Sequence, residues 1–184
     1  MAMKEDFPAL PGFYKLLFLH LEPISTISPA ILAWVFPGAA WFHHQLIPSS
    51  EPVPDISSLD GRTKMAIWQL GNCYLLLGLI SSLVFRAIRD ALPNDLVAQE
   101  RIVGASLTAL ALADVSRIQS IVASYIGLPA ELRSDFASWN PMTHGNITFV
   151  IFLLSVRLAW FAGIGRKTYY YARSTPYVQD KKSK

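Results

Sequence analysis

Four ionisable side chains lie within long apolar stretches of this sequence. Glu22 is part of "FLHLEPISTISPAILAWVF", Asp114 and Arg117 share "IVGASLTALALADVSRIQSIVASYI", and Arg157 is in "ITFVIFLLSVRLAWF". A charge at the centre of a membrane helix costs roughly 2.5–3.5 kcal/mol on insertion scales, whereas a Leu or Ile returns only about 0.3–0.6 kcal/mol. We therefore expect these side chains to face one another inside a helical bundle and to form a polar chamber that opens toward the lumenal side.

Glu22 has the pattern of a general acid. Pro23 follows it directly, and no Lys or Arg lies within one helical turn of it in the same stretch. A carboxyl group that is desolvated and unpaired favours its neutral form, which can donate a proton. Asp114 is our candidate for taking a proton back, so Glu22 and Asp114 form the predicted catalytic pair.

Other polar and aromatic residues are candidates for binding a substrate near this pair. Asp114 and Arg117 are three residues apart and share a helix face, either as a salt bridge that holds the bundle or as a functional pair. Isolated amides in membrane helices also hold helices together, so this interpretation stays open for each of them. The candidate substrate-binding residues are Gln69, Asn72, Tyr74, Arg117, Trp139, Asn140, Asn146 and Arg157.

Long apolar segments must position these residues. The chain of 184 residues is 52% hydrophobic and 16% charged, whereas soluble domains carry about 25% charged residues. Four segments reach the roughly 20 residues that a membrane crossing needs; they are 12–36, 65–86, 102–126 and 142–165. We predict an all-α integral membrane protein, with a four-helix transmembrane bundle over residues 12–165 and both termini cytosolic.

The distribution of Lys and Arg predicts this orientation, because the cytosolic flanks of membrane helices are enriched in both. The predicted cytosolic side holds eleven of them, and the opposite loops hold three, Arg62, Lys64 and Arg133. Residues 1–11 and the basic tail 166–184 are then cytosolic, and the Pro-rich loop 37–64 is lumenal. Because these charges lie at helix ends, we expect no nucleic-acid partner.

The last four residues, "KKSK", resemble the dilysine retrieval signal of endoplasmic-reticulum membrane proteins. Such a signal must lie at an exposed cytosolic C-terminus, which is where the charge distribution places it. We therefore expect a multi-pass protein of the endoplasmic-reticulum membrane. The alternative is an ordinary solvated basic tail.

Four motifs carry a family resemblance: "LEPIS", "QLGNCYLLLGL", "ALALADVSRI" and "WNPMTHGNITFVIFLLSVR". By their order and spacing the chain, from about Phe13 to Gly165, resembles an uncharacterised family of small fungal four-helix membrane proteins. Relatives often carry a histidine where this chain has Arg117. More distantly, the arrangement looks like emopamil-binding-type sterol isomerases and the fungal membrane-bound terpene cyclases of secondary metabolism. Both groups use intramembrane acids and aromatic rings, but fold alone does not determine function.

We therefore expect a membrane-embedded acid–base isomerase or cyclase that takes an apolar terpenoid, meroterpenoid or sterol-like substrate from the lipid bilayer. Glu22 would protonate it, and aromatic rings would stabilise the carbocation; the candidates are Trp68, Tyr74, Trp139 and Trp160. No cofactor is expected, because the sequence has no phosphate-binding glycine loop. No metal is expected either, because His43 and His44 lack further ligands at a suitable spacing.

The alternative is a non-enzymatic lipid- or sterol-binding protein, or an assembly protein, of the endoplasmic-reticulum membrane. In that case Asp114, Arg117 and Arg157 would form a locked polar core beside a ligand seat. A channel or transporter is a third option, for which four helices are few unless the chain forms a homo-oligomer.

Overall fold

The computed structural model describes residues 7–48, 52 and 59–171, and within them the chain is helical with no strand. Four helical stretches are long and apolar enough to cross a membrane, which confirms the predicted all-α transmembrane architecture. They are Phe13–Trp34, Gly61–Ala91, Leu96–Gly127 and Pro141–Phe161. We refer to them as the first to fourth spans.

Each span contains more than one helical element. The π-helical turns are η1 and η2, and a short 3-10 turn, η3, precedes the fourth span. In chain order the elements are α1 (Phe13–Leu16), η1 (Leu17–Leu21), α2 (Glu22–Trp34), α3 (Ala39–Gln45), α4 (Gly61–Leu79), η2 (Ile80–Val84), α5 (Phe85–Ala91), α6 (Leu96–Ser116), α7 (Ile118–Gly127), η3 (Phe136–Ser138), α8 (Pro141–Asn146) and α9 (Thr148–Phe161).

The second and third spans begin earlier than their apolar content predicts. Asp60 caps α4 by accepting hydrogen bonds from the backbone amides of Arg62 and Thr63, at 2.9 and 3.1 Å. Asp95 caps α6 by accepting one from the amide of Ala98 at 2.9 Å. A side-chain acceptor at the N-cap satisfies amides that have no partner within the helix. The caps therefore set where these helices begin, and polar flanking turns join the apolar segments.

The expected lumenal loop 37–64 contains a helix of its own. Residues 39–45 form α3, and Phe42 of this helix is fully buried. Phe42 packs with buried residues of α2 and α4, including Ala33 and Tyr74. Ala39 and Phe42 give α3 an apolar face that packs against α2 and α4. The connection is therefore helical at residues 39–45, where we expected irregular structure.

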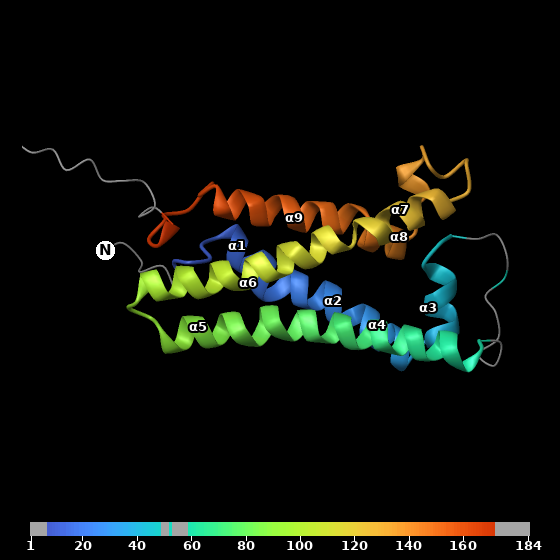
Figure 1. The fold of residues 1–184 in the computed structure, drawn as a ribbon, viewed down its shortest axis with the longest axis horizontal. Coiled ribbons are helices and arrows are strands. Elements are labelled where there is room, and N and C mark those ends of the chain that lie inside the picture. Colours follow the sequence, from blue (N-terminus) through green and yellow to red (C-terminus); the bar gives the residue numbers. More distant parts are fainter. Residues whose placement is uncertain (1–6, 49–51, 53–58, 172–184) are drawn as a thin grey trace, which may run out of the picture.

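The bundle has two distinct ends (Figure 1). We call the end that holds Phe7, Tyr171 and α5 the terminal end, and the end that holds α3, α7 and α8 the distal end. The described ends of the chain meet at the terminal end, where the indole N–H of Trp160 donates to the carbonyl of Ala9 at 2.8 Å. An even number of crossings requires this arrangement, whichever side of a membrane the terminal end occupies.

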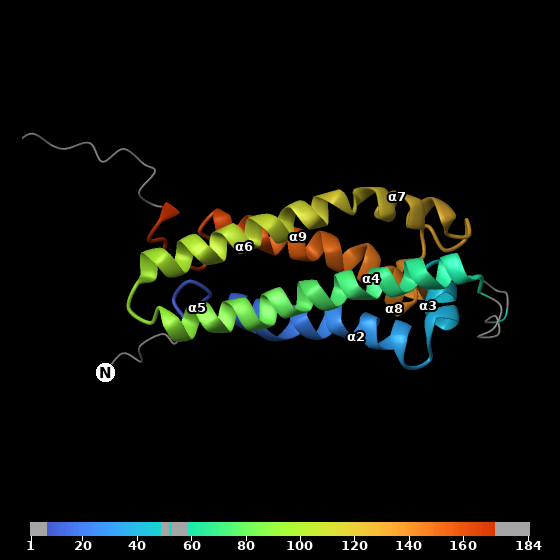
Figure 2. The ribbon, with the colours of Figure 1, turned by 60° about the horizontal axis from the view of Figure 1, so that its bottom comes forward.

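The main hydrophobic core lies toward the terminal end and draws on all four spans. Phe18, Phe85, Leu107 and Trp160 are completely buried there, one from each span. Two smaller cores replace it toward the distal end, where α3, α7 and α8 lie (Figure 2). One is built on α2, α3 and α4, with Met142 from α8, and the other contains Leu128, Trp139 and Ile147. The helices are thus joined by one core at the terminal end and by separate cores at the distal end.

A buried ion pair anchors the segment that follows the fourth span. The Arg166 guanidinium lies 2.5 Å from a carboxylate oxygen of Glu100, and both side chains are fully buried. The other oxygen of Glu100 accepts hydrogen bonds from the backbone amides of Tyr169 and Tyr170. Residues 166–171, the start of the expected tail, therefore pack against α6; residues 172–184 lie outside the described residues.

Candidate functional site

Three charged side chains from three spans meet in the middle of the bundle. Arg157 of α9 places one guanidinium nitrogen 2.5 Å from a carboxylate oxygen of Glu22. Its second terminal nitrogen pairs with a carboxylate oxygen of Asp114 in α6. All three residues are buried, with 1% of Arg157, 2% of Glu22 and 6% of Asp114 exposed. We call this group the charged triad; it links the first, third and fourth spans.

The second span joins the triad through a serine. Ser81, in η2, donates a hydrogen bond of 3.3 Å to the same Glu22 oxygen that Arg157 contacts. Ser81 lies in η2, and Glu22 directly follows η1, so two π-helical turns flank this contact. Such turns often occur at functional sites, because they redirect side chains within an otherwise regular helix.

Pro23 accounts for a further contact near Glu22. A proline has no N–H, so it cannot bond the carbonyl of Leu19 four residues earlier. The sequence therefore predicts that another helix or a ligand supplies a donor to this carbonyl. The structure confirms this, since a guanidinium nitrogen of Arg86 lies 3.3 Å from the oxygen of Leu19.

The expectation that Glu22 is unpaired is wrong, because its partner, Arg157, comes from a different span. The expected pairing of Asp114 with Arg117 is also replaced. Helix α6 ends at Ser116, and Arg117 occupies the joint between α6 and α7. The Arg117 guanidinium contacts the Tyr74 ring, and Asp114 binds Arg157 instead.

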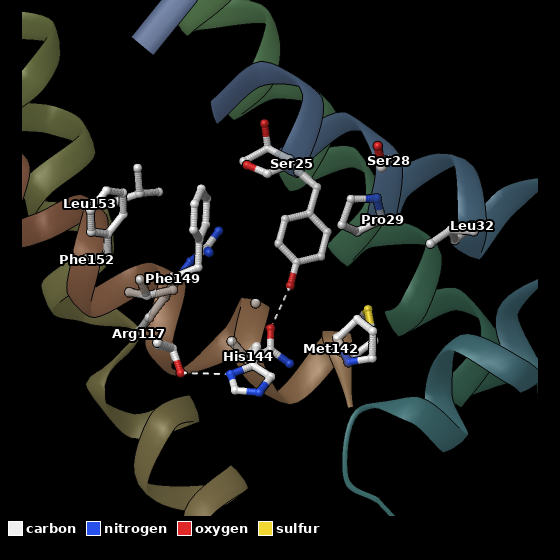
Figure 3. Close-up of a pocket in the computed structure, with 17 residues that line it drawn as sticks. Ser25, Ser28, Pro29, Leu32, Arg117, Met142, His144, Phe149, Phe152 and Leu153 are labelled. Atoms are coloured by element: carbon white, nitrogen blue, oxygen red, sulfur yellow. Dashed lines mark hydrogen bonds between the residues drawn. The ribbon is translucent and has the colours of Figure 1, made fainter. Parts of the chain in front are cut away.

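A cavity of about 630 Å³ lies beside the triad, toward the distal end. Figure 3 shows Ser25, Pro29 and Leu32 of α2 on one side of it and Phe149 and Leu153 of α9 on the other. The remaining lining residues include Tyr74 of α4, Arg117, and Met142, His144, Gly145 and Asn146 of α8. Such a volume falls within the range of roughly 300–1,000 Å³ that is typical of small-molecule sites.

The mouth of the cavity runs along the side of the bundle. Its exposed lining residues are Ser28 and Phe152 at mid-span, and Pro141, Gly145 and Thr148 nearer the distal end. By contrast, Tyr74, Val150 and Leu153 are buried and form the inner wall. The cavity thus opens sideways between α2 and the fourth span, and it reaches toward the distal end.

Hydrogen bonds fix several polar groups of the lining. The Tyr74 hydroxyl donates to the side-chain oxygen of Asn146 at 3.3 Å, and His144 lies 3.2 Å from the Thr148 hydroxyl (Figure 3). The Arg117 guanidinium stands over the Tyr74 ring, 5.3 Å from its centroid. Arg117 is the only charged residue among those that line this cavity.

The predicted site residues fall into three groups, of which the first two lie close together. Tyr74, Arg117 and Asn146 line the cavity, whereas Glu22, Asp114 and Arg157 lie about one helical turn farther toward the terminal end. The structure therefore separates the predicted catalytic pair from the space in which a ligand fits.

Four predicted binding residues besides Arg157 do not line the cavity. Gln69 and Asn72 are exposed on α4 and bond each other at 3.2 Å. Trp139 belongs to a distal core and donates to the Leu132 carbonyl at 2.7 Å. Asn140 caps α8 and also donates to the Gln45 carbonyl at 3.1 Å.

None of the tryptophans proposed to face a carbocation lines the cavity either. Trp68 is partly exposed beneath Lys64, and Trp160 is buried in the terminal core beside Arg166. The aromatic residues of the cavity are Tyr74, Phe149 and Phe152. Sequence reasoning missed both phenylalanines, although they lie on the same stretch as Asn146 and Arg157.

Residues 7–167 match the family described as a domain of unknown function, DUF7704. The chain belongs to this family. The matched region includes all four spans of the DUF7704 protein, its charged triad, its cavity and the Glu100–Arg166 ion pair. No curated protein and no solved structure matches it.

The described part of the DUF7704 chain holds no group of three His, Cys, Asp or Glu residues placed to bind a metal ion. What its geometry offers is a lateral, mainly apolar cavity with one cation and several hydrogen-bonding groups, beside a buried cluster of charges. This arrangement can hold an elongated molecule that is mostly apolar and polar at one point.

Proposed function

We propose that this DUF7704 protein binds a lipid- or sterol-like molecule within the membrane, with the cavity between α2 and the fourth span as its seat. The observation that carries the proposal is the position of the mouth. Ser28 and Phe152 are exposed inside their spans, six and eleven residues from the distal ends at Trp34 and Pro141, where the surroundings of a transmembrane helix are hydrocarbon. An apolar molecule can move from the bilayer into such a cavity without crossing water.

The charged triad then serves as the locked polar core that holds the spans together on the terminal side of the ligand. Polar contacts between membrane helices replace the hydrophobic driving force, which is weak in lipid. Because Arg157 binds carboxylates of two other spans, it fixes the bundle at the level where the distal cores separate. The cavity can stay open because the triad, rather than side-chain packing, holds its inner end.

We place the protein in the endoplasmic-reticulum membrane, with both termini in the cytosol. The excess of Lys and Arg at the terminal end supports this orientation. The "KKSK" sequence supports the compartment, and it lies outside the described residues.

Filling the cavity tests this function. Gly145 lines the cavity, and a Cβ built on it has no neighbouring atom within 4 Å, so Gly145→Leu adds side-chain volume at the cavity mouth without a clash at its Cβ. Purified protein in nanodiscs is irradiated with diazirine-bearing palmitate, palmityl alcohol or sterol. We expect at least one probe to label α2 and α9 saturably, and Gly145→Leu to reduce this labelling at least tenfold.

Gly61→Leu is the matched control, because Gly61 also has open space at its Cβ and lies far from the cavity at the start of α4. It should label like the wild type. Labelling that no unlabelled competitor reduces, or that Gly145→Leu leaves unchanged, contradicts the proposed seat.

A second candidate function is the proton-initiated isomerase or cyclase, with an apolar terpenoid, meroterpenoid or sterol-like substrate. Its supporting observation is a charge count: two carboxyl groups, Glu22 and Asp114, share one guanidinium, Arg157. One oxygen of Glu22 is also buried with no hydrogen-bond partner among the described residues. A proton held there would make the triad neutral and would be available to a substrate one turn away. The fungal resemblance and the distant likeness to sterol isomerases belong to this proposal.

Deuterium incorporation distinguishes the two functions. An isoprenoid with a terminal alkene, whose protonation forms a carbon–deuterium bond, is incubated with the protein in D₂O, and products are examined by mass spectrometry. The enzyme proposal expects a carbon-bound deuterium that Glu22→Gln abolishes and the exposed control Glu131→Gln does not. The binding proposal expects the isoprenoid to be recovered unchanged from all three proteins.

A further inference from the structure

We infer that the ligand of this cavity is a single-chain amphiphile whose oxyanion head, a carboxylate or a phosphate, binds Arg117. The inference rests on the proposed function and names the class of molecule that the seat takes. Three observations support it: the Arg117 side chain has no ion-pair or hydrogen-bond partner among the described residues, further hydrogen-bond donors surround Tyr74, and the other walls of the cavity are apolar.

Arg117 is placed as a ligand-binding cation. Its side chain makes no ion pair and no hydrogen bond with any described residue, and its five N–H donors are unfilled. Asp114, one turn back, attracts it but lies beyond ion-pair distance and is bound by Arg157. Arg117 is half-buried, and it differs from the buried Arg157 and Arg166 side chains, which each pair with a carboxylate. A charge within a membrane bundle is costly, and an unfilled one marks a functional site.

The groups next to Arg117 are donors too. The Tyr74 hydroxyl donates to the carbonyl oxygen of the Asn146 side chain, which leaves the amide N–H groups of Asn146 free to donate to a ligand. Arg117 and Asn146 both contact Tyr74, so their donors surround one aromatic ring. No carboxylate lines the cavity. A set of donors without an acidic residue selects an oxyanion, above all where a guanidinium can bind two of its oxygens.

The walls away from this polar point suit one hydrocarbon chain. They are formed by Leu32, Met142, Phe149, Phe152 and Leu153. The mouth extends from mid-span to the distal end, so the chain of a bound amphiphile can leave the cavity sideways between α2 and α9. A ligand without a head would leave Arg117 desolvated and unfilled, which is the cost that an oxyanion removes.

Three probes with the same chain test this class: oleate, oleyl phosphate and the neutral oleyl alcohol. Binding to wild type, Arg117→Gln and Arg117→Lys is measured by titration calorimetry in an uncharged detergent. We expect the wild type to bind at least one anionic probe about tenfold to hundredfold more tightly than the alcohol, as hydrogen bonds to a charged group allow. Arg117→Gln should lose this preference while still binding the alcohol, and Arg117→Lys should keep part of it.

Arg62→Gln is the control for charge, because Arg62 lies at the exposed start of α4 outside the cavity. It should bind all three probes like the wild type. The tighter of the two anionic probes tells a carboxylate head from a phosphate head. Equal wild-type affinity for the alcohol and both anions overturns the inference, and this comparison needs no variant to fold. The inference also fails if Arg117→Gln keeps the preference.

The same data separate this inference from the proposed function. If all probes bind equally and Gly145→Leu prevents their binding, the seat stands and only the oxyanion head is wrong. If no oleyl probe binds the wild type, the inference fails, and the seat itself fails only if the palmitate, palmityl alcohol and sterol photoprobes also give no saturable labelling.

Discussion

At the scale of single residues, Arg157 is the side chain on which the middle of the bundle depends. It is 1% exposed and is the only guanidinium in contact with Glu22 and Asp114 among the described residues. Removing it would leave two carboxyl groups buried at one point without a counter-charge. Removing either carboxylate instead would leave one acid and one base, which is the neutral combination.

We therefore predict that Arg157→Met destabilises the protein by about 3–5 kcal/mol, the usual cost of breaking a buried ion pair from one side. Glu22→Gln and Asp114→Asn, made singly, should be tolerated. The measurement is the thermal midpoint of the detergent-purified protein, followed by size-exclusion fluorescence. Arg157→Met combined with both amide substitutions should recover much of the loss. A triple variant that is no more stable than Arg157→Met alone would show that charge is not the cause.

The residue scale is also where sequence reasoning was partly successful. The cost of charge in hydrocarbon predicts that Glu22, Asp114 and Arg157 point inward, and the structure brings them into contact. It does not predict which acid meets which base. Spacing along one helix favoured Asp114 with Arg117, whereas the observed partner is 43 residues away in sequence. Contacts between spans depend on helix rotation and depth, which a single sequence does not specify.

At the scale of elements, the first two spans are the most closely packed pair, and two glycines make this possible. Gly71 and Gly78 lie on one face of α4, two turns apart. A Cβ at Gly71 would overlap the Trp34 ring, and one at Gly78 would overlap side chains of Ile27 and Thr26. Small residues allow close approach of membrane helices, which is the main source of their association in lipid.

Gly78→Val should therefore destabilise the protein by about 1–3 kcal/mol, the usual cost of overpacking. Gly145→Val is the matched control, because its Cβ has open space and the new side chain has the same shape. The difference between the two thermal midpoints isolates the clash from the change in helix propensity. Equal midpoints would mean that α2 can move away from α4 at no cost.

Element types were predictable from the sequence, but their interruptions were not. Apolar length predicts four spans, because each crossing requires roughly 20 such residues. The joints at Arg117 and Ile147 have no Pro or Gly at the break itself, so no local signal marks them. Ile147, at one joint, is buried in the distal core that contains Leu128 and Trp139, and Ile121 of α7, just after the other joint, packs against the same core. Tertiary packing produces these joints, and one of them places Arg117 in the cavity wall.

At the scale of the whole molecule, the terminal and distal halves of the bundle have different roles. The terminal core joins all four spans, and the buried Glu100–Arg166 ion pair lies at the same end. The distal half has separate cores, and the cavity lies between them. Substitutions in the distal half can therefore change ligand binding without unfolding the bundle, because the terminal core and the charged triad hold the four spans together.

The same division predicts how the protein lies in its membrane. Among the described residues, the distal side has three Lys and Arg residues outside the spans' centres, and the terminal side has six: Lys15, Arg86, Arg89, Arg101, Arg166 and Lys167. Positive charge is retained in the cytosol during insertion, so the terminal end should be cytosolic and the cavity should open in the other half of the bilayer. Single cysteines at Asn94 and Glu131, in a Cys73→Ala background, report on the two ends, because these residues follow α5 and α7 respectively.

In sealed microsomes a membrane-impermeant maleimide should modify the cysteine at position 94 directly. It should modify the cysteine at position 131 only after a low concentration of a non-ionic detergent has permeabilised the microsomal membrane. Full modification of both in solubilised membranes controls for access to each thiol. The reverse pattern would place the cavity in the cytosolic half, where its ligand would come from the other leaflet, and would remove the topological basis for a C-terminal retrieval signal.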